Sequence, residues 1–73
     1  MNTIKFNKNV TIKIKRTWDN EEYEFLINFL EIGREYINLY RFEEMNYKGT
    51  NWTKKVLVES FDNSQYYEWH IEE

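Results

Sequence analysis

The chain contains no cysteine, proline or alanine and only two glycines among its 73 residues. Without cysteine, neither a disulfide framework nor a cysteine-based zinc site can form. Two glycines are too few for a glycine-rich phosphate-binding loop. No apolar run is long enough to span a bilayer, and the N-terminal segment alternates polar and apolar residues instead of carrying the apolar core of a secretory signal. These absences predict a cytoplasmic protein that needs no membrane and no cofactor.

Aromatic residues are the feature in which the sequence is rich, with five Phe, six Tyr and three Trp. Each large ring can bury roughly 150–250 Å² of surface, so burial of the rings can stabilise the fold in place of disulfide bonds. A chain of this length supports only one core, and residues 1–73 are interpreted as a single domain. Frequent Asn, Ile, Lys, Glu and Tyr, all with AT-rich codons, indicate a low-GC bacterium or one of its phages or mobile elements.

Alternating polar and apolar residues predict β-strands at both ends of the chain. The N-terminal alternation predicts a β-hairpin over residues 2–7 and 10–17, with Asn7-Lys8-Asn9 as its turn. Three further segments are rich in β-branched and aromatic residues and are predicted as strands, at residues 35–44, 53–61 and 65–72.

Residues 20–32 fit a helix better than a strand. On a helical wheel their polar side chains, except Glu22, fall within an arc of about 100°, whereas a strand would place Leu26 and Leu30 on the same face as Glu24. Asp19 suits the N-cap, and Gly33 suits the position just past the C-terminus. The sequence therefore predicts the order ββαβββ, an α+β domain of two layers with one helix packed on one face of an antiparallel sheet. An all-β arrangement of six strands is the alternative.

The surplus of aromatic residues predicts an interaction surface. If Ile37, Leu39 and the last strand face the helix, the opposite sheet face exposes aromatic side chains, namely Tyr36, Tyr40, Phe42 and Tyr66. The helix would carry an acidic stripe that is either simply solvated or occupies a basic groove on a larger protein. The residues of this stripe are Glu21, Glu24, Glu31 and Glu35.

Charge is distributed unevenly. Residues 1–18 carry five basic side chains and no acidic one, whereas residues 19–73 carry five basic and thirteen acidic side chains. Together with the aromatic residues, this predicts a non-enzymatic binding module that docks on a larger protein, such as a nucleic-acid-processing enzyme, by steric occupancy. An inhibitor or regulator encoded by a phage or mobile element, of the anti-defence or nuclease-blocking type that anti-CRISPR proteins represent, fits this description by analogy.

Two alternatives remain open. The first is a nucleic-acid-binding protein that uses a Lys/Tyr sheet face containing Lys5, Lys13 and Lys15. The second is a subunit that associates with itself, for example as a homodimer.

Catalysis has little support in the sequence. The only histidine, His70, lies in a Glu68-x-His70-x-Glu72 pattern that is more often plain strand surface than a metal site. Ser60 and Ser64 have no spacing to His70 that would assemble a nucleophile, a base and an orienting group. The sequence therefore predicts no catalytic, cofactor-binding or metal-binding residue.

Overall fold

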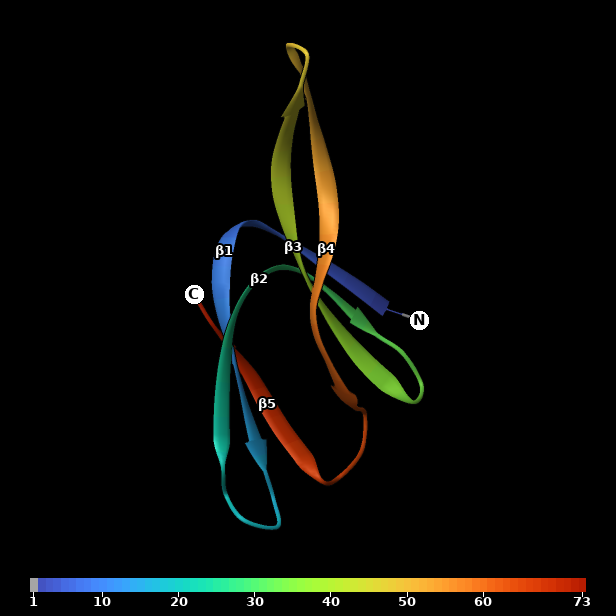
Figure 1. Ribbon diagram of the computed structural model, residues 1–73. Coiled ribbons are helices and arrows are strands. Elements are labelled where there is room, and N and C mark those ends of the chain that lie inside the picture. Colours follow the sequence, from blue (N-terminus) through green and yellow to red (C-terminus); the bar gives the residue numbers. More distant parts are fainter. Residues whose placement is uncertain (1) are drawn as a thin grey trace.

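The computed structural model describes residues 2–73, which form one sheet of five antiparallel strands and contain no helix (Figure 1). The strands are β1 (Asn2–Arg16), β2 (Glu22–Ile32), β3 (Tyr36–Tyr47), β4 (Thr50–Asp62) and β5 (Tyr67–Glu72). They lie in the order β4-β3-β2-β1-β5, so β5 returns to pair with β1. The predicted α+β fold is wrong, and the all-β alternative is confirmed, with five strands in place of six.

Residues 20–32, predicted as a helix, contain strand β2 because their apolar pattern is a strand period that changes phase once. From Tyr23 to Ile27 every second side chain faces inward, and beyond Asn28 the inward positions include Leu30. One change of phase turns strict alternation into spacings of i, i+4 and i+7, which are the spacings of a helix. The helical wheel therefore fitted a strand that contains an irregularity.

The hairpin predicted over residues 2–7 and 10–17 is instead the single bent strand β1 (Figure 1). Its register with β2 shifts between Lys5 and Val10, so the residues between them have no ladder partner on β2. Irregularities of this kind bend a strand and increase its twist. Because of this bend the sheet curves and encloses one of its two faces, which is called the inner face below.

The side chain of Asn28 stabilises this bend from the β2 side. Its amide nitrogen donates to Asn9 Oδ1 at 2.5 Å, and its carbonyl oxygen accepts the backbone N–H of Phe42 at 3.0 Å. The ladder between β2 and β3 ends at the pair Phe29–Tyr40, so Asn28 satisfies a backbone donor of β3 just beyond that point. From there β3 continues with β4 as its only ladder partner.

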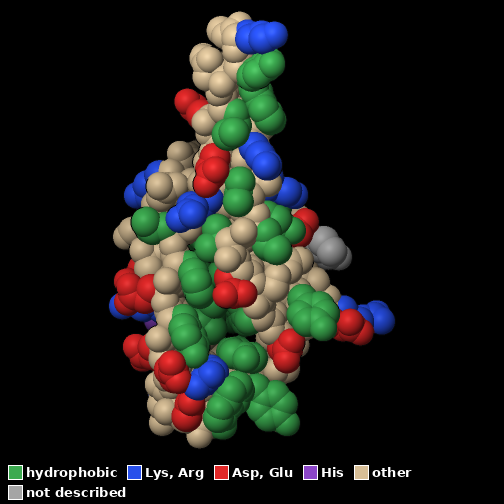
Figure 2. All heavy atoms as spheres, in the orientation of Figure 1, with side chains coloured by type: hydrophobic (Ala, Val, Ile, Leu, Met, Phe, Trp, Pro, Cys, Tyr) green, Lys and Arg blue, Asp and Glu red, His purple; other side chains and the backbone are tan. Residues whose placement is uncertain are grey.

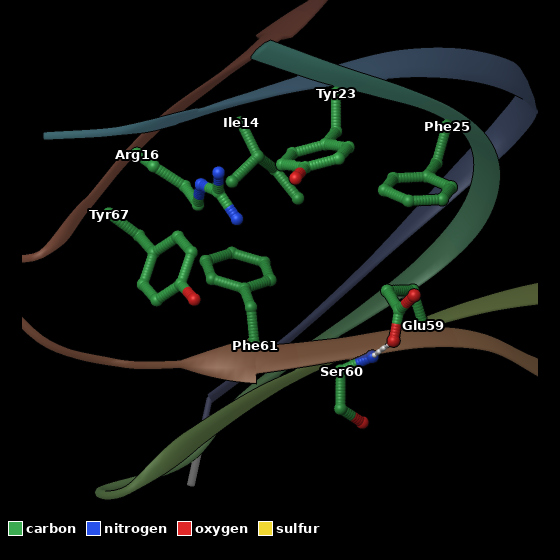
Figure 3. A pocket seen from close by; sticks show the side chains of 8 residues that line it. All are labelled: Ile14, Arg16, Tyr23, Phe25, Glu59, Ser60, Phe61 and Tyr67. Carbon is green, nitrogen blue, oxygen red and sulfur yellow. Dashed lines mark hydrogen bonds between the residues drawn. The ribbon is translucent and has the colours of Figure 1, made fainter. Parts of the chain in front are cut away.

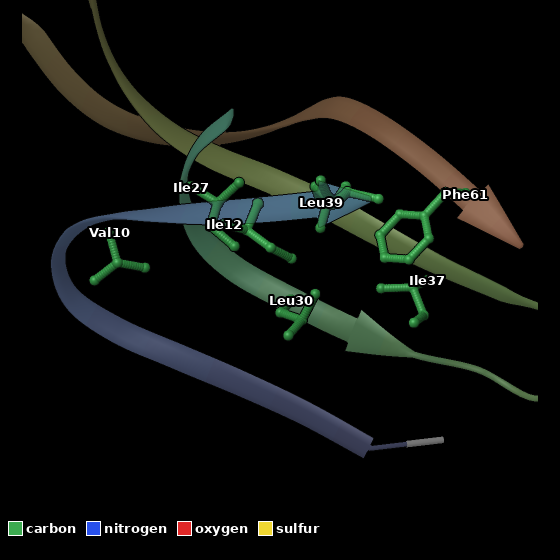
Figure 4. Close-up of a cluster of buried hydrophobic side chains, with 8 residues drawn as sticks. Val10, Ile12, Ile27, Leu30, Ile37, Leu39 and Phe61 are labelled. Carbon is green, nitrogen blue, oxygen red and sulfur yellow. The ribbon is translucent and has the colours of Figure 1, made fainter. Parts of the chain in front are cut away.

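The hydrophobic core lies on the inner face of the wrapped sheet and joins four strands (Figure 4). Its buried members are Val10, Ile12, Ile14, Ile27, Leu30, Ile37, Leu39 and Phe61. Half-buried side chains of β5 pack against the same cluster, namely Tyr67, Trp69 and Ile71. The folded-over sheet thus covers the side chains that the predicted helix was expected to cover.

Beyond the core, β3 and β4 extend as a hairpin that projects from the rest of the molecule (Figure 1). Residues 43–55 of this hairpin, called the arm below, are exposed at every position. At its tip Tyr47 pairs with Thr50, and Lys48 and Gly49 between them have φ angles of 50° and 80°. Positive φ at both central residues is what the tightest hairpin turns require. Residues 45–47 and 50–52, which lie between the predicted strands 35–44 and 53–61, are therefore strand as well.

Candidate functional site

The eight predicted partner-binding residues do not form one surface. Tyr36, Tyr40 and Phe42 occupy alternate positions of β3 and share its outer face. Tyr66 lies in the turn before β5, where its ring contacts Trp18. The four glutamates are spread over the β1–β2 turn, strand β2 and the β2–β3 turn, in the order Glu21, Glu24, Glu31 and Glu35. Since β2 is a strand, the predicted acidic stripe is not a single face.

The outer face of β2 and β3 carries an aromatic cluster bordered by lysine instead of glutamate. The ring of Phe29 meets those of Tyr40 and Phe42 edge to face, with centroids 5.8 and 5.9 Å apart. Lys55 Nζ lies 5.1 Å from the ring centroid of Phe29 and 4.6 Å from that of Tyr40, and Lys5 Nζ lies 5.4 Å from that of Phe42. Cations over ring faces are attracted by the ring quadrupole. The lysines therefore lie over two of the rings that were predicted to bind a partner, Tyr40 and Phe42, and not over Tyr36 or Tyr66.

Glu31 is engaged by this cluster. The Tyr40 hydroxyl donates to Glu31 Oε1 at 2.7 Å, and the Asn38 amide approaches the same oxygen at 3.5 Å. The hydrogen bond to Glu31, with a smaller contribution from burial, raises the pKa of Tyr40 above its ordinary value. Glu31 therefore orients Tyr40 within the face.

Lys13, predicted to belong to a nucleic-acid-binding face, is paired with carboxylates. Its Nζ lies 3.2 Å from Glu72 Oε1 and 3.5 Å from Glu24 Oε1. Cross-strand pairs of opposite charge are common on sheet surfaces. Because Lys13 is already paired with two carboxylates, a phosphate would have to compete with them for it. This weakens the prediction that the face containing Lys13 binds nucleic acid.

The Lys13–Glu72 pair predicts a pH dependence of stability. Hydrogen bonds from Lys13, and to a lesser extent from His70, lower the pKa of Glu72 from its ordinary 4.5. Between pH 4.5 and the lower pKa of Glu72 in the folded protein, the unfolded chain binds more protons than the folded protein does. The stabilisation that the Lys13–Glu72 pair provides is therefore fully present above pH 4.5 and is lost as the pH falls through the folded-state pKa of Glu72. Thermal unfolding followed across this acidic range should show a midpoint that falls less steeply for Lys13→Gln than for the wild type.

Lys15→Gln is the matched control for this experiment, because Lys15 lies on the same face of β1 and makes no salt bridge within residues 2–73. It should retain the wild-type pH dependence. Equal slopes for the two variants would contradict the assignment.

A different surface combines exposed aromatic rings with acidic side chains. It comprises residues 17–22 and 63–68, which are the β1–β2 and β4–β5 turns with the first residues of β2 and β5, and is called the acidic tip below. Trp18 and Tyr66 are 58% and 55% exposed and meet edge to face, with centroids 6.3 Å apart. The two turns are tied together because the Thr17 N–H donates to the carbonyl oxygen of Tyr66 at 2.9 Å. Four carboxylates belong to this tip: Asp19, Glu21, Glu22 and Glu68.

Arg16 organises the acidic tip from within. Its guanidinium pairs with the carboxylates of Asp19 and Glu21 and lies 5.0 Å from the Trp18 ring centroid. The hydrogen bond from Arg16, aided by the backbone N–H of Glu21, lowers the pKa of Asp19 below its ordinary value. Asn20 takes a left-handed φ of 60°, which asparagine tolerates better than most residues. These contacts hold the β1–β2 turn in one conformation, with Trp18 on its outside.

A cavity of about 230 Å³ lies behind the acidic tip, between β4 and the paired strands β1 and β2 (Figure 3). Four rings from three strands border it, namely Tyr23, Phe25, Phe61 and Tyr67, together with Ile14, Arg16, Glu59 and Ser60. In Figure 3 the Arg16 guanidinium points between the rings of Tyr23 and Tyr67. Small-molecule sites are usually about 300–1,000 Å³, so this cavity is small and part of its polar lining is already paired.

Within residues 2–73 no three His, Asp or Glu side chains are arranged to hold a metal ion. His70 Nε2 lies 3.4 Å from Glu72 Oε1, which is also the partner of Lys13. The same residues contain no helix with the length and apolar character needed to cross a membrane.

Sequence reasoning missed two tryptophans. Trp18 packs against Tyr66 and Tyr67. Trp52, which falls outside every predicted strand, lies on the arm in β4. A comparison of the chain with protein-family models, curated proteins and solved structures finds no match.

Proposed function

We propose that the chain is a non-catalytic cytoplasmic binding module that docks its acidic tip on a basic surface of a larger protein. The observation that carries the proposal is the pair of exposed rings, Trp18 and Tyr66, held on two mutually hydrogen-bonded turns. Of the four carboxylates of the tip, Asp19 and Glu21 pair with Arg16, and Glu22 and Glu68 make no salt bridge within residues 2–73. Trp and Tyr are the residues most enriched in binding hot spots. Surrounding carboxylates orient a partner of opposite charge and speed association.

The position of the rings supports this proposal over the outer face of β3. On that face the rings of Tyr40 and Phe42, beside Lys55 and Lys5, are half-buried, whereas the ring of Trp18 remains more than half exposed even with Arg16 beside it. Binding at a preorganised turn also costs little conformational entropy. In this proposal the module blocks its partner by occupancy, and its role as an inhibitor or regulator encoded by a phage or mobile element rests on composition alone.

The test is a pull-down from a lysate of a low-GC bacterium with the tagged chain, followed by measurement of affinity for the recovered partner. Trp18→Ala and Tyr66→Ala are each expected to weaken binding by about 30-fold, the loss typical of a hot spot. Binding should also weaken with salt, since the charged contacts are exposed.

Trp52→Ala is the matched control, because it removes an equally exposed tryptophan from the other end of the molecule. It should leave the affinity for this partner unchanged. Recovery of no stoichiometric partner, or equal losses in Trp18→Ala and Trp52→Ala, would count against docking through the acidic tip.

A further inference from the structure

The arm has no structural role that accounts for its composition. Residues 43–55 are exposed on both faces, and the ladder between β2 and β3 ends before they begin. Two-stranded ribbons without further strands are only marginally stable in water. Aromatic side chains on such a ribbon fill no core, so their presence calls for a ligand.

One face of the arm gathers its three large apolar side chains. Met45 is directly opposite Trp52, and Tyr47 lies diagonally from Trp52 on the same face. Tyr47 is 65% and Trp52 is 50% exposed. Figure 2 shows hydrophobic side chains along the arm and a basic side chain at its tip. Lys48 lies in the turn between β3 and β4. The arm contains no Val, Ile, Leu or Phe, the residues that usually fill an apolar groove between proteins.

The charge of the arm is opposite to that of the body. Residues 45–55 carry Lys48, Lys54 and Lys55 and no acidic side chain. Arg41 and Lys5 lie near the base of the arm, where Lys5 reaches the ring of Phe42. Two glutamates, at positions 43 and 44, are the only acidic residues of the arm. By contrast, residues 10–40 and 56–73 carry four basic and eleven acidic side chains.

The net charge of −3 does not exclude binding of a polyanion at the arm. The molecule is 49 Å long, and the arm forms one end of it (Figure 1). At physiological salt the Debye length is about 8 Å. Most carboxylates of the body are therefore screened from a ligand bound at the end of the arm. The charge of the arm itself then determines whether a polyanion binds there.

From these observations we infer that the arm binds single-stranded nucleic acid. Two exposed rings on one face offer stacking platforms for successive bases. Lys54 on the same face and Lys48, whose Nζ lies 5.3 Å from the Tyr47 ring centroid, offer contacts for phosphates, whereas Lys55 lies on the opposite face. The site differs from the Lys13-containing face, where the cation is already paired, and from the acidic tip at the other end of the molecule.

The experiment measures fluorescence anisotropy of labelled oligothymidine and oligouridine of about 15 nucleotides, the upper range of site sizes for such proteins. Trp52→Ala and Tyr47→Ala should each weaken binding about tenfold, while Trp52→Phe, which keeps a stacking ring, should retain most of it. The logarithm of the binding constant should fall with the logarithm of salt concentration with a slope of about −1.4, as expected for two phosphate contacts.

Tyr36→Ala and Lys15→Gln are the controls, since both residues lie outside the arm and Tyr36 is also exposed. Neither should change the affinity. No binding at low salt would overturn the inference, as would binding that Trp52→Ala leaves unchanged. Equal affinity for duplex DNA or effective competition by polyglutamate would do the same, since both would indicate a non-specific polyanion contact. The result is independent of the acidic tip, because Trp18→Ala should not alter it.

Discussion

Leu30→Ala is expected to lower the free energy of unfolding by about 2–5 kcal/mol, whereas Leu26→Ala should lower it by less than about 0.5 kcal/mol. Both leucines belong to β2, but Leu30 is 0% exposed and Leu26 is 50% exposed. Removing the Leu30 side chain leaves a cavity that the neighbouring core residues can fill only in part. Urea denaturation followed by tryptophan fluorescence measures both losses.

This pair of variants also separates the two folds considered for the segment. Positions 26 and 30 are one helical turn apart, so an amphipathic helix would bury both and both substitutions would be costly. In the bent strand the two side chains lie on opposite faces. Comparable losses for the two variants would therefore contradict the sheet. Leu30→Val supplies an intermediate deletion if Leu30→Ala unfolds a domain whose total stability is only about 5 kcal/mol.

Phe61→Ala is expected to cost about 3–5 kcal/mol, the other large effect in this protein. Phe61 is directly opposite Ile37 on β3, and its ring centroid lies 5.7 Å from that of Tyr67 on β5. It is therefore the side chain through which the two edge strands of the sheet, β4 and β5, meet across the core. Its removal should loosen β5 and enlarge the cavity beside it.

Leu57→Ala is the matched control on the same strand, because its side chain is exposed, and it should cost less than about 0.5 kcal/mol. Phe61→Leu should recover much of the loss by restoring apolar volume. Hydrogen exchange gives a second measurement: in Phe61→Ala the amides of β5 should lose protection first. Retention of wild-type stability by Phe61→Ala would show that β4 and β5 are held together by other contacts.

Much of the core could be predicted from the sequence, because strict alternation survives where strands are regular. Val10, Ile12 and Ile14 alternate with polar residues in the segment predicted as a strand from residue 10 onward, and all three are buried. The outer and inner faces of β3 were also separated correctly, with Ile37 and Leu39 inside. Alternation is informative here because side chains on a strand point to opposite faces in turn.

The helix was predicted wrongly because irregularities in a strand leave no mark in composition. Asn28 looks like one more polar residue of an amphipathic segment, yet its side chain binds Asn9 and Phe42 from two other strands. Those contacts depend on a register that only the folded sheet defines. The proposed site was hidden for the same reason, since Trp18 and Tyr66 meet only through the pairing of β1 with β5.

The strand order also has a consequence for how quickly the chain folds. Three of the four strand pairings join consecutive strands and can form as local hairpins, whereas β1 and β5 pair only after β2, β3 and β4 have been bridged. Closing so long a loop loses chain entropy before any contact compensates for it, and β topologies with such contacts fold in milliseconds to seconds. Until β5 arrives, one edge of β1 remains open to other chains, a period in which aggregation competes with folding. The kinetic weak point of this molecule is therefore its shortest strand.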